Sequence, residues 1–209
     1  MPDVVIATRS RGKLREIQHM TAGSALRWLT LDDAESAATY AGPRPLPEPI
    51  EDGATFADNA QLKALHYAAL TGVHTLADDS GLVVDALGGA PGVHSARYAG
   101  QPRDDAANNA KLVAALSGVP PERRTARFIC RMAFAEPGRV LLESGGQVEG
   151  RIVDAPRGKN GFGYDPYFFI PPLDRTAAEL PPHEKSAVSH RGAALREILP
   201  RIEVLLLPT

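Results

Sequence analysis

The sequence predicts an α/β protein, because patterns typical of strands and of helices follow one another along its 209 residues. Residues 4–7 are four consecutive apolar side chains, as in a buried strand. Residues 104–116 have the spacing of an amphipathic helix, which Gly118 ends. Over residues 124–135 apolar side chains alternate with others, which indicates a long half-buried strand. We expect a single domain over residues 1–209, or two closely packed lobes, with a sizeable core.

Charge and composition exclude several classes of protein. The net charge of −2 and the pI near 6.3 give no electrostatic basis for non-specific nucleic-acid binding. Cys130 is the only cysteine, so no intrachain disulfide can form and a reducing compartment is expected. The N-terminus is unlike a signal peptide, and no apolar stretch approaches membrane-spanning length. We therefore expect a cytoplasmic protein with no membrane or nucleic-acid partner.

A polar turn follows the first strand and leads into a helix whose apolar side carries Leu14, Ile17 and Met20. A turn between a strand and a helix start directs backbone N–H groups and the positive helix end toward an anion. The turn is not a Walker A loop, because Ala7 stands where the first glycine would be. The alternative is a basic connection in solvent, but its hydroxyls, glycine and three cations favour phosphate binding. The candidate phosphate-binding residues are Thr8, Arg9, Ser10, Arg11, Gly12 and Lys13.

Two adjacent acids, Asp78 and Asp79, end a short apolar run. We expect the strand to stop at these acids, turn at Gly81 and start again through residues 82–84. Successive side chains on a strand point to opposite faces, so the acids can share a target only if the turn rotates one of them. Carboxylates at a strand end beside Ser80 suit a magnesium–phosphate site, since Mg²⁺ takes oxygen ligands. The alternative is an Asp-rich turn that caps neighbouring backbone N–H groups.

Between these two stretches the sequence predicts a loop and a capped helix. Residues 42–53 are rich in proline and acids and are expected to form a surface loop. Thr55 and Asp58 have the spacing of a capping box, which predicts a helix that stops near Gly72. Lys63 is expected on the solvated face of this helix; the alternative is that it points into the site.

Further strand patterns follow in the second half of the chain. Residues 140–153 predict more strands, which we expect Gly145 and Gly146 to interrupt, so that part of the sheet is antiparallel. Residues 167–170 predict a short strand. Cys130 falls on the apolar face of the long strand, where it is expected to pack in the core and not to act as a nucleophile.

A second glycine-rich loop, residues 158–166, combines aromatic residues with an acid. Its glycines do not match the dinucleotide-binding spacing. An aromatic ring can stack on a base and a carboxylate can accept hydrogen bonds from base N–H groups, so we interpret the loop as a base pocket. The alternative is aromatic core at a junction between loop and strand. The candidates are Phe162, Gly163, Tyr164 and Asp165.

The C-terminal part of the chain carries a group of cations near a helix start. Ser189 is expected to be the N-cap of the last helix. His190 and Arg191 then lie in the first turn, where the helix dipole disfavours cations. Cations placed against this preference, with Lys185 close by in sequence, suggest an anionic or acceptor-rich partner. A histidine on its own would more often be structural.

Taken in order, these stretches resemble the inosine triphosphate pyrophosphatase family, which acts on non-standard purine nucleoside triphosphates. Each motif alone is only moderately specific, but the ordered set is highly specific and covers nearly the whole chain. The motifs that carry the resemblance are residues 6–8, 55–60, 77–81, 89–92, 95–98, 161–166, 184–186 and 189–192.

The resemblance implies a two-lobed α/β fold with a long mixed central sheet flanked by helices, an active-site cleft between the lobes, and a homodimer. It implies hydrolysis of ITP, dITP or XTP to the monophosphate and pyrophosphate, with Mg²⁺ as cofactor. By matching position, Asp79 would be the general base and a metal ligand, and Glu51 a second acid near the metal. The turn of residues 8–13 and Ser80 would hold the phosphates. The base would be held by Phe162, Gly163, Tyr164, Asp165, Lys185, His190 and Arg191.

The chemistry of the base pocket agrees with this resemblance in part. Lys185 and Arg191 donate hydrogen bonds, which favours a purine with a 6-keto group. Adenine offers a 6-amino donor at that position and would leave buried partners unpaired, which is how binding sites reject analogues strongly.

Two departures and two alternatives accompany the resemblance. The family usually has Asn where this chain has Ser10, and Glu where it has Asp58. The nearer alternative is a Maf-type nucleotide pyrophosphatase that acts on other bases. The more distant one is a nucleotide sensor that binds without hydrolysis, which the acids Asp79 and Glu51 disfavour.

Overall fold

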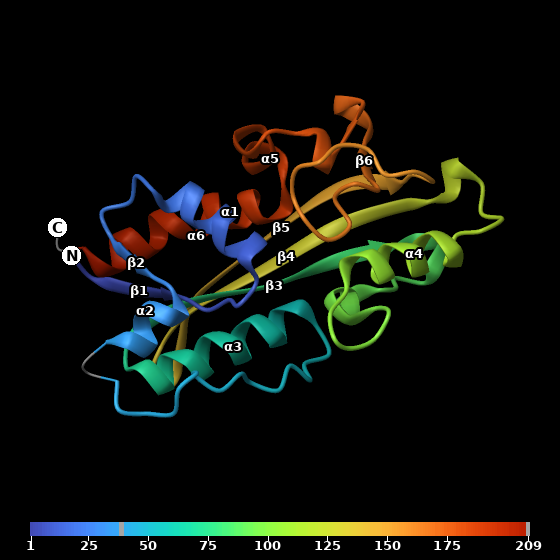
Figure 1. The fold of residues 1–209 in the computed structure, drawn as a ribbon. Coiled ribbons are helices and arrows are strands. Elements are labelled where there is room, and N and C mark those ends of the chain that lie inside the picture. Colours follow the sequence, from blue (N-terminus) through green and yellow to red (C-terminus); the bar gives the residue numbers. More distant parts are fainter. Residues whose placement is uncertain (38–39, 208–209) are drawn as a thin grey trace. The chain divides into compact units, whose positions relative to one another are not determined.

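The computed structural model describes residues 1–37 and 40–207, which form two compact units. The first unit contains residues 1–79, 131–145 and 194–209, and the second contains residues 80–130 and 146–193. The strands, labelled in Figure 1, are β1 (Asp3–Ile6), β2 (Arg27–Leu29), β3 (His74–Val84), β4 (Thr125–Glu136), β5 (Arg139–Ile152), β6 (Phe168–Ile170) and β7 (Arg175–Thr176). The α-helices are α1 (Arg11–Thr21), α2 (Leu31–Ser36), α3 (Phe56–Thr71), α4 (Asp105–Ala115), α5 (Pro182–Val188) and α6 (His190–Leu206).

The strands form a mixed sheet of seven strands in the order β2-β1-β3-β4-β5-β6-β7. β1 is parallel to both β2 and β3, whereas β6 is antiparallel to β5 and to β7. In the register of β1 and β3, Ile6 lies opposite Leu76. The turn that follows β1 therefore starts beside the part of β3 that carries Asp78 and Asp79. The expected mixed sheet with an antiparallel section is confirmed.

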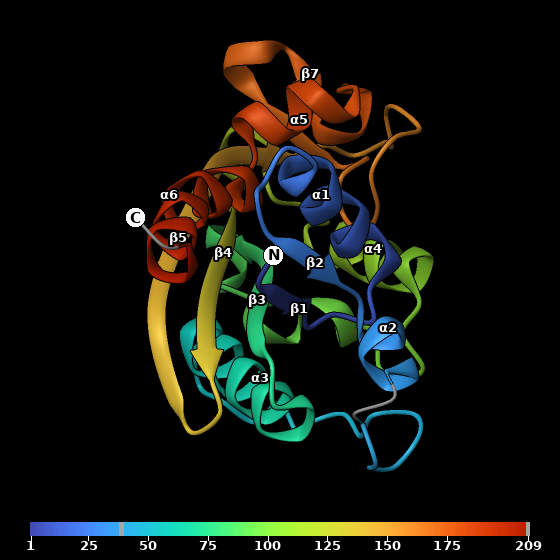
Figure 2. The same cartoon turned by 90° about the vertical axis from the view of Figure 1, so that its left-hand side faces the viewer.

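The core of the first unit depends on small side chains. Ala60, Ala64 and Ala68 recur every four residues along α3, and each is at most 1 % exposed. They pack with Val5 of β1 and Ala77 of β3 in one apolar cluster. Alanine allows the helix to lie close to the sheet. In Figures 1 and 2, α3 covers one face of this part of the sheet and α1 lies over the other.

The second unit has its own apolar core. It joins the end of β3 to α4, β4 and the strands near residue 170. Phe128 and Phe168 pack in it with ring centroids 4.5 Å apart. Cys130 is also fully buried, which confirms its expected place in the core.

Local signals in the sequence place most helix ends correctly. Thr55 and Asp58 form both hydrogen bonds of a capping box at the start of α3. Gly72 ends that helix in the left-handed conformation, with φ of 69°. Asp104 caps α4 by accepting from the backbone of residues 106 and 107, and Ser189 Oγ accepts from Gly192 N at the start of α6. Residues 42–53 contain no helix or strand.

The expected turn at Gly81 is wrong, because β3 continues without a break through Asp78, Asp79 and Gly81. Burial explains the difference, since most residues of this central strand are buried on both faces. A strand paired on both sides keeps extended backbone even where acids and a glycine favour a turn locally. Asp78 and Asp79 therefore point to opposite faces of the sheet.

The expected break at Gly145 and Gly146 is also wrong, because β5 runs unbroken from Arg139 to Ile152. A Cβ atom at Gly145 would lie 2.3 Å from Nη1 of Arg131. The glycine thus leaves space for the arginine side chain to approach the backbone of β5. A glycine inside a strand can mark such a close approach as well as a turn.

Among the residues that the structure describes, no helix is long and apolar enough to cross a membrane.

Candidate functional site

Two buried carboxylates on β3 form the centre of the candidate site in the first unit. Asp78 is 2 % exposed and Asp79 is 7 % exposed. Oδ2 of Asp78 lies 3.1 Å from Nζ of Lys13 in α1. Oδ1 of Asp79 accepts a hydrogen bond of 2.9 Å from Nζ of Lys63 in α3. Because the two acids point to opposite faces of β3, each is paired with a lysine from a different helix.

Lys63 joins two of the predicted acidic residues. Its ammonium group donates to Asp79 and also to Oε2 of Glu51, at 3.1 Å. The residue is only 8 % exposed, so the expectation that it lies on a solvated face is wrong. The signal in the sequence was its place beside Ala60 and Ala64, on the side of α3 that faces the sheet.

A second side chain of α3 reaches the same carboxylate. Asn59 precedes Lys63 by four residues and therefore lies on the same side of the helix. Its Nδ2 lies 3.5 Å from Oδ2 of Asp79, and its Oδ1 accepts from Gly53 N at 2.8 Å. Asn59 thus links the acid to the loop that carries Glu51. No local pattern around Asn59 indicates on its own that it is a site residue.

Burial and charge act in opposite directions on the pKa of Asp79. Burial raises the pKa of its carboxyl group, and the nearby Lys63 and Lys13 lower it, with the net shift upward. For Lys63, burial lowers the ammonium pKa, but the carboxylates of Asp79, Asp78 and Glu51 outweigh it and raise that pKa above its ordinary value. Lys63 therefore stays charged at neutral pH, and Asp79 has the more basic carboxylate that a proton acceptor needs.

The turn of residues 8–13 adjoins these acids because of the strand register. Ala7 N donates to Leu76 O at 2.8 Å, which holds the start of the turn against β3. Ser10 caps α1, and no acid lies in the first turn of that helix. Thr8 Oγ1 accepts from Ser10 N at 3.2 Å. The turn therefore presents a helix N-terminus and the Lys13 cation beside Asp78, an arrangement that suits an anion.

Arg9 points to a different partner. It donates to Oδ1 of Asp32 at 2.8 Å, pairs with Glu35 and donates to Leu46 O. Both acids belong to α2. These contacts fix the turn to α2, and they favour a supporting role for Arg9 over direct contact with a phosphate.

Replacing Ser10 by alanine is expected to lower the free energy of unfolding by about 0.5 kcal/mol, the low end for an N-cap, because its bond to Lys13 N is long at 3.5 Å. Asparagine caps helices as well as serine does, so Ser10→Asn should unfold at the wild-type urea concentration. Urea denaturation of both variants measures the difference. A Ser10→Asn protein less stable than Ser10→Ala would contradict the capping role.

The second unit holds the other group of predicted residues, centred on Asp165. Oδ2 of this buried carboxylate accepts from Nζ of Lys185 at 2.6 Å and from Phe162 N at 2.7 Å. Gly161 and Gly163 have φ angles of +74° and +61°, which favour glycine. A Cβ atom at Gly161 would lie 2.1 Å from Oδ2 of Asp165. The glycines thus allow the loop to close around the carboxylate.

Cations and rings gather around this loop. Nζ of Lys185 lies 5.0 Å from the centroid of the Phe162 ring, and Cζ of Arg191 lies 5.8 Å from it. Arg191 is 2 % exposed and donates to Ser80 Oγ at 2.7 Å. The ring of His190 stacks on Phe128, with centroids 4.9 Å apart. Ser80, expected among the phosphate ligands, is therefore placed with the candidate base-binding residues.

A small pocket, partly open to solvent, lies against this group within the second unit. Asp165, Lys185, Ser189 and His190 supply its polar lining, and the rest is apolar.

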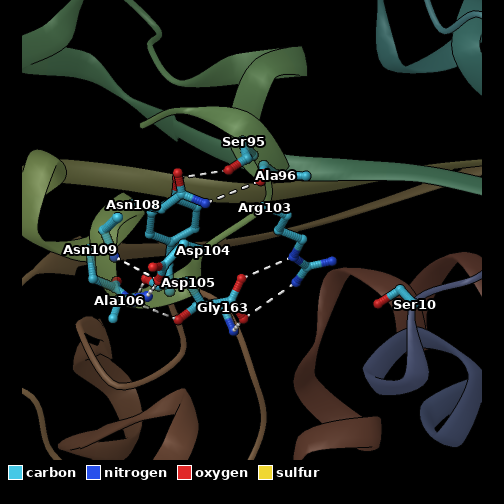
Figure 3. A network of polar contacts seen from close by, with 12 residues as sticks. Ser10, Ser95, Ala96, Arg103, Asp104, Asp105, Ala106, Asn108, Asn109 and Gly163 are labelled. Atoms are coloured by element: carbon cyan, nitrogen blue, oxygen red, sulfur yellow. Dashed lines mark hydrogen bonds and ion pairs between the residues drawn. The ribbon is translucent and has the colours of Figure 1, made fainter. Parts of the chain in front are cut away.

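Tyr164 differs from its neighbours in the loop. Its ring packs in the apolar core and its hydroxyl donates to Ser95 O at 2.8 Å, so it anchors the loop. Figure 3 shows a network of polar contacts that includes Ser95, Asn109 and Gly163.

Comparisons with known proteins give one consistent result. The Ham1 family model matches residues 4–201. A dITP/XTP pyrophosphatase of Geobacter sulfurreducens is 50% identical over 195 residues, which are 93% of this chain and 94% of that protein. The dITP/XTP pyrophosphatase of Geobacillus kaustophilus is 48% identical over 198 residues, 95% of this chain and 93% of its own length.

Solved structures agree with these matches. A HAM1 protein from Coxiella burnetii is similar with a TM-score of 0.84 and 40% identity, covering 98% of this chain and 100% of that one. A nucleoside-triphosphatase / dITP/XTP pyrophosphatase from Mycobacterium abscessus has a TM-score of 0.70 and 44% identity, covering 95% and 99%. The expected α/β fold with a mixed central sheet flanked by helices is confirmed.

Proposed function

The chain belongs to the Ham1 family, and from this premise we propose that it hydrolyses dITP, ITP and XTP to the nucleoside monophosphate and pyrophosphate. The observation that carries the proposal is the buried carboxylate of Asp79, hydrogen-bonded to Lys63 in a chain about half identical to dITP/XTP pyrophosphatases. Such an activity removes non-standard purine triphosphates from the nucleotide pool.

Asp79 is the general base in this proposal. Attack of water on a phosphorus atom requires a group that orients the water and accepts its proton. The raised pKa of Asp79 supports this role, because a more basic carboxylate takes a proton more readily. Lys63 and Asn59 both donate to this carboxylate and thereby fix its orientation.

Asp79 and Glu51 are the residues that would hold Mg²⁺. Their oxygens already converge on one cation, the Lys63 ammonium group, which fits a site built for positive charge. No group of three His, Cys, Asp or Glu side chains suited to a metal occurs in residues 1–37 and 40–207. Mg²⁺ commonly takes only one or two carboxylates, with phosphates and waters completing its shell. When bound, the ion neutralises the charge that develops on the phosphate oxygens.

The N-terminus of α1 holds the triphosphate. The backbone N–H groups of its first turn and the cations of Arg11 and Lys13 favour negative charge. Thr8 and Ser10 add hydroxyl groups to the same turn. Cations on the leaving pyrophosphate lower the barrier to its departure.

The purine is held by the loop of residues 161–165 and by Lys185, His190 and Arg191. Phe162 offers a ring on which the base can stack, and Lys185 and Arg191 offer donors to a 6-keto oxygen. Asp165 accepts hydrogen bonds and holds Lys185 in place. An adenine base would bring its own 6-amino donor against these donors, so ATP is rejected.

A substrate panel with and without Mg²⁺ tests the proposal. Pyrophosphate release is measured from XTP, dITP, ITP, GTP, ATP and dTTP, first in EDTA and then after Mg²⁺ is added back. We expect kcat/KM for XTP and dITP to exceed that for ATP by at least about a hundredfold, and only with Mg²⁺. Preference for dTTP would indicate a different base specificity, and binding of XTP without any turnover would indicate a sensor.

Replacing Gly161 by alanine is expected to raise KM for XTP by about tenfold or more. The new Cβ would displace the Asp165 carboxylate, which lies 2.1 Å from that position, and would release Lys185 from it. Gly138→Ala is the matched comparison, because φ is positive at both glycines but nothing lies within 4 Å of a Cβ at Gly138, which lies between β4 and β5 and outside this loop. Steady-state kinetics compare them, and equal effects would contradict a specific role for the Asp165 carboxylate.

A homodimer stays a prediction from the resemblance, and a cytoplasmic location stays a prediction from the composition. Sedimentation of the purified protein tests the oligomeric state. A monomer at all concentrations would contradict the dimer and would leave the proposed reaction untouched.

A further inference from the structure

Both backbone polar groups of Gly163 are held by side chains of α4. Gly163 N donates to Oδ2 of Asp105 at 2.9 Å, and Gly163 O accepts from Nδ2 of Asn109 at 2.9 Å. Figure 3 shows these bonds meeting at one residue of the loop. All of these residues belong to the second unit. The glycine is therefore fixed by a helix more than fifty residues away in sequence.

The Asn109 amide is held by two acceptors, one of which is the backbone carbonyl of Asp105. Asp105 and Asn109 are four residues apart on α4 and lie on the same side of the helix. Nδ2 of Asn109 also donates to Asp105 O at 2.8 Å. Turning the amide over would place its oxygen against two carbonyl oxygens, so the orientation of Asn109 is determined by its partners. The residue is only 8 % exposed, so water does not readily replace these bonds.

Gly163 needs such support because of its conformation. Its φ of +61° lies in the left-handed region, and as a glycine it has no side chain to hold it there. The neighbouring Phe162 and Asp165 are the groups proposed to contact the base. A change in the backbone at Gly163 would move both of them relative to Lys185.

We propose that Asp105 and Asn109 are positioning residues for base recognition, which act by holding the left-handed backbone of Gly163. This inference rests on the proposed function and adds to it two residues that do not touch the nucleotide themselves. The loss of either bond should weaken binding of the base without changing the reacting groups. The effect should appear in KM and not in kcat.

Neighbouring residues supply matched controls. Asp104 is also a carboxylate at the N-terminus of α4, but its Oδ1 accepts from the backbone of residues 106 and 107 and not from Gly163. Asp104→Ala therefore weakens the helix cap and leaves the loop bonds intact. Asp105→Asn keeps a carbonyl oxygen that can accept from Gly163 N. Arg103 pairs with Asp105 at 3.0 Å in an exposed contact, which contributes little.

The test compares the kinetics of Asp105→Ala, Asp105→Asn, Asn109→Ala and Asp104→Ala with XTP. We expect Asp105→Ala and Asn109→Ala to raise KM about tenfold with kcat within about twofold of wild type. Asp105→Asn should recover most of the loss, and Asp104→Ala should lower Tm without raising KM. Inhibition by pyrophosphate, which has no base, should be unchanged in all of them. Unchanged KM in Asp105→Ala, or an equal rise in Asp104→Ala, would overturn the inference.

Amide hydrogen exchange separates this inference from the proposed function. Exchange at Gly163 should be faster in Asp105→Ala than in wild type and unchanged in Asp104→Ala. If the wild-type protein hydrolyses no nucleotide of the panel, the proposed function is wrong. Faster exchange at Gly163 in Asp105→Ala would still show that Asp105 holds the backbone of Gly163. Equal exchange at Gly163 in Asp105→Ala and in wild type would contradict the role of Asp105 in holding this backbone, whatever the activity.

Discussion

Asp79→Asn is expected to reduce kcat for XTP and dITP by about a thousandfold or more while nucleotide binding is largely retained. Asparagine has the shape of aspartate and its carbonyl oxygen can still accept from Lys63 Nζ. It cannot accept a proton from water at neutral pH, so the reaction loses its base. Stopped assays over long times measure the residual turnover, and calorimetry with the monophosphate product measures binding.

The pH dependence of the wild-type protein provides a control for this assignment. Because burial raises the pKa of Asp79, turnover should rise with pH through a midpoint above the ordinary Asp value of 3.8. That rise should be absent from the residual activity of Asp79→Asn. Turnover of the variant within tenfold of wild type would refute the role of Asp79 as base.

Lys63→Met is expected to have the second largest effect, on both stability and turnover. The change leaves the buried Asp79 and the nearby Glu51 without their shared ammonium group. Breaking a buried ion pair from one side destabilises proteins by about 3–5 kcal/mol. The carboxyl pKa of Asp79 should then rise further, because burial remains and the main opposing charge is gone. Urea denaturation and the pH dependence of kcat measure the two effects.

The double variant Lys63→Met/Asp79→Asn shows whether an unpaired charge causes the instability. Without the Asp79 carboxylate, much of the lost stability should return, although turnover stays absent. In wild type, Lys63 has a folded pKa above its ordinary 10.5. Its stabilising contribution is therefore full below pH 10.5 and is lost as pH rises through the folded value. Additive destabilisation in the double variant would contradict the pairing of these residues.

Features that depend on neighbouring residues along the chain could be predicted from the sequence. The capping box of Thr55 and Asp58, the end of α3 at Gly72 and the long alternating strand around Phe128 are of this kind. Hydrogen bonds across three residues and the two-residue repeat of a strand determine them. The basic turn after β1 and the acids of β3 were each selected from the sequence, and the structure pairs Lys13 with Asp78.

Features set by distant residues could not be predicted in this way. Gly81 stays extended because β3 is a buried central strand. Gly145 leaves space for the side chain of Arg131. Lys63 is buried because Asp79 and Glu51, 16 and 12 residues away, compensate its charge. The contacts of Asp105 and Asn109 with Gly163 could not be predicted for the same reason, since a polar side chain near a helix start can bond to several local or distant groups.

Analysis of the products of dITP hydrolysis by ³¹P NMR shows which phosphoanhydride bond the protein breaks. We expect pyrophosphate and dIMP in equal amounts, with no dIDP at any time, because the proposed reaction breaks the α–β bond. Inorganic phosphate with dIDP would mean attack at the terminal phosphorus and would contradict the proposed reaction.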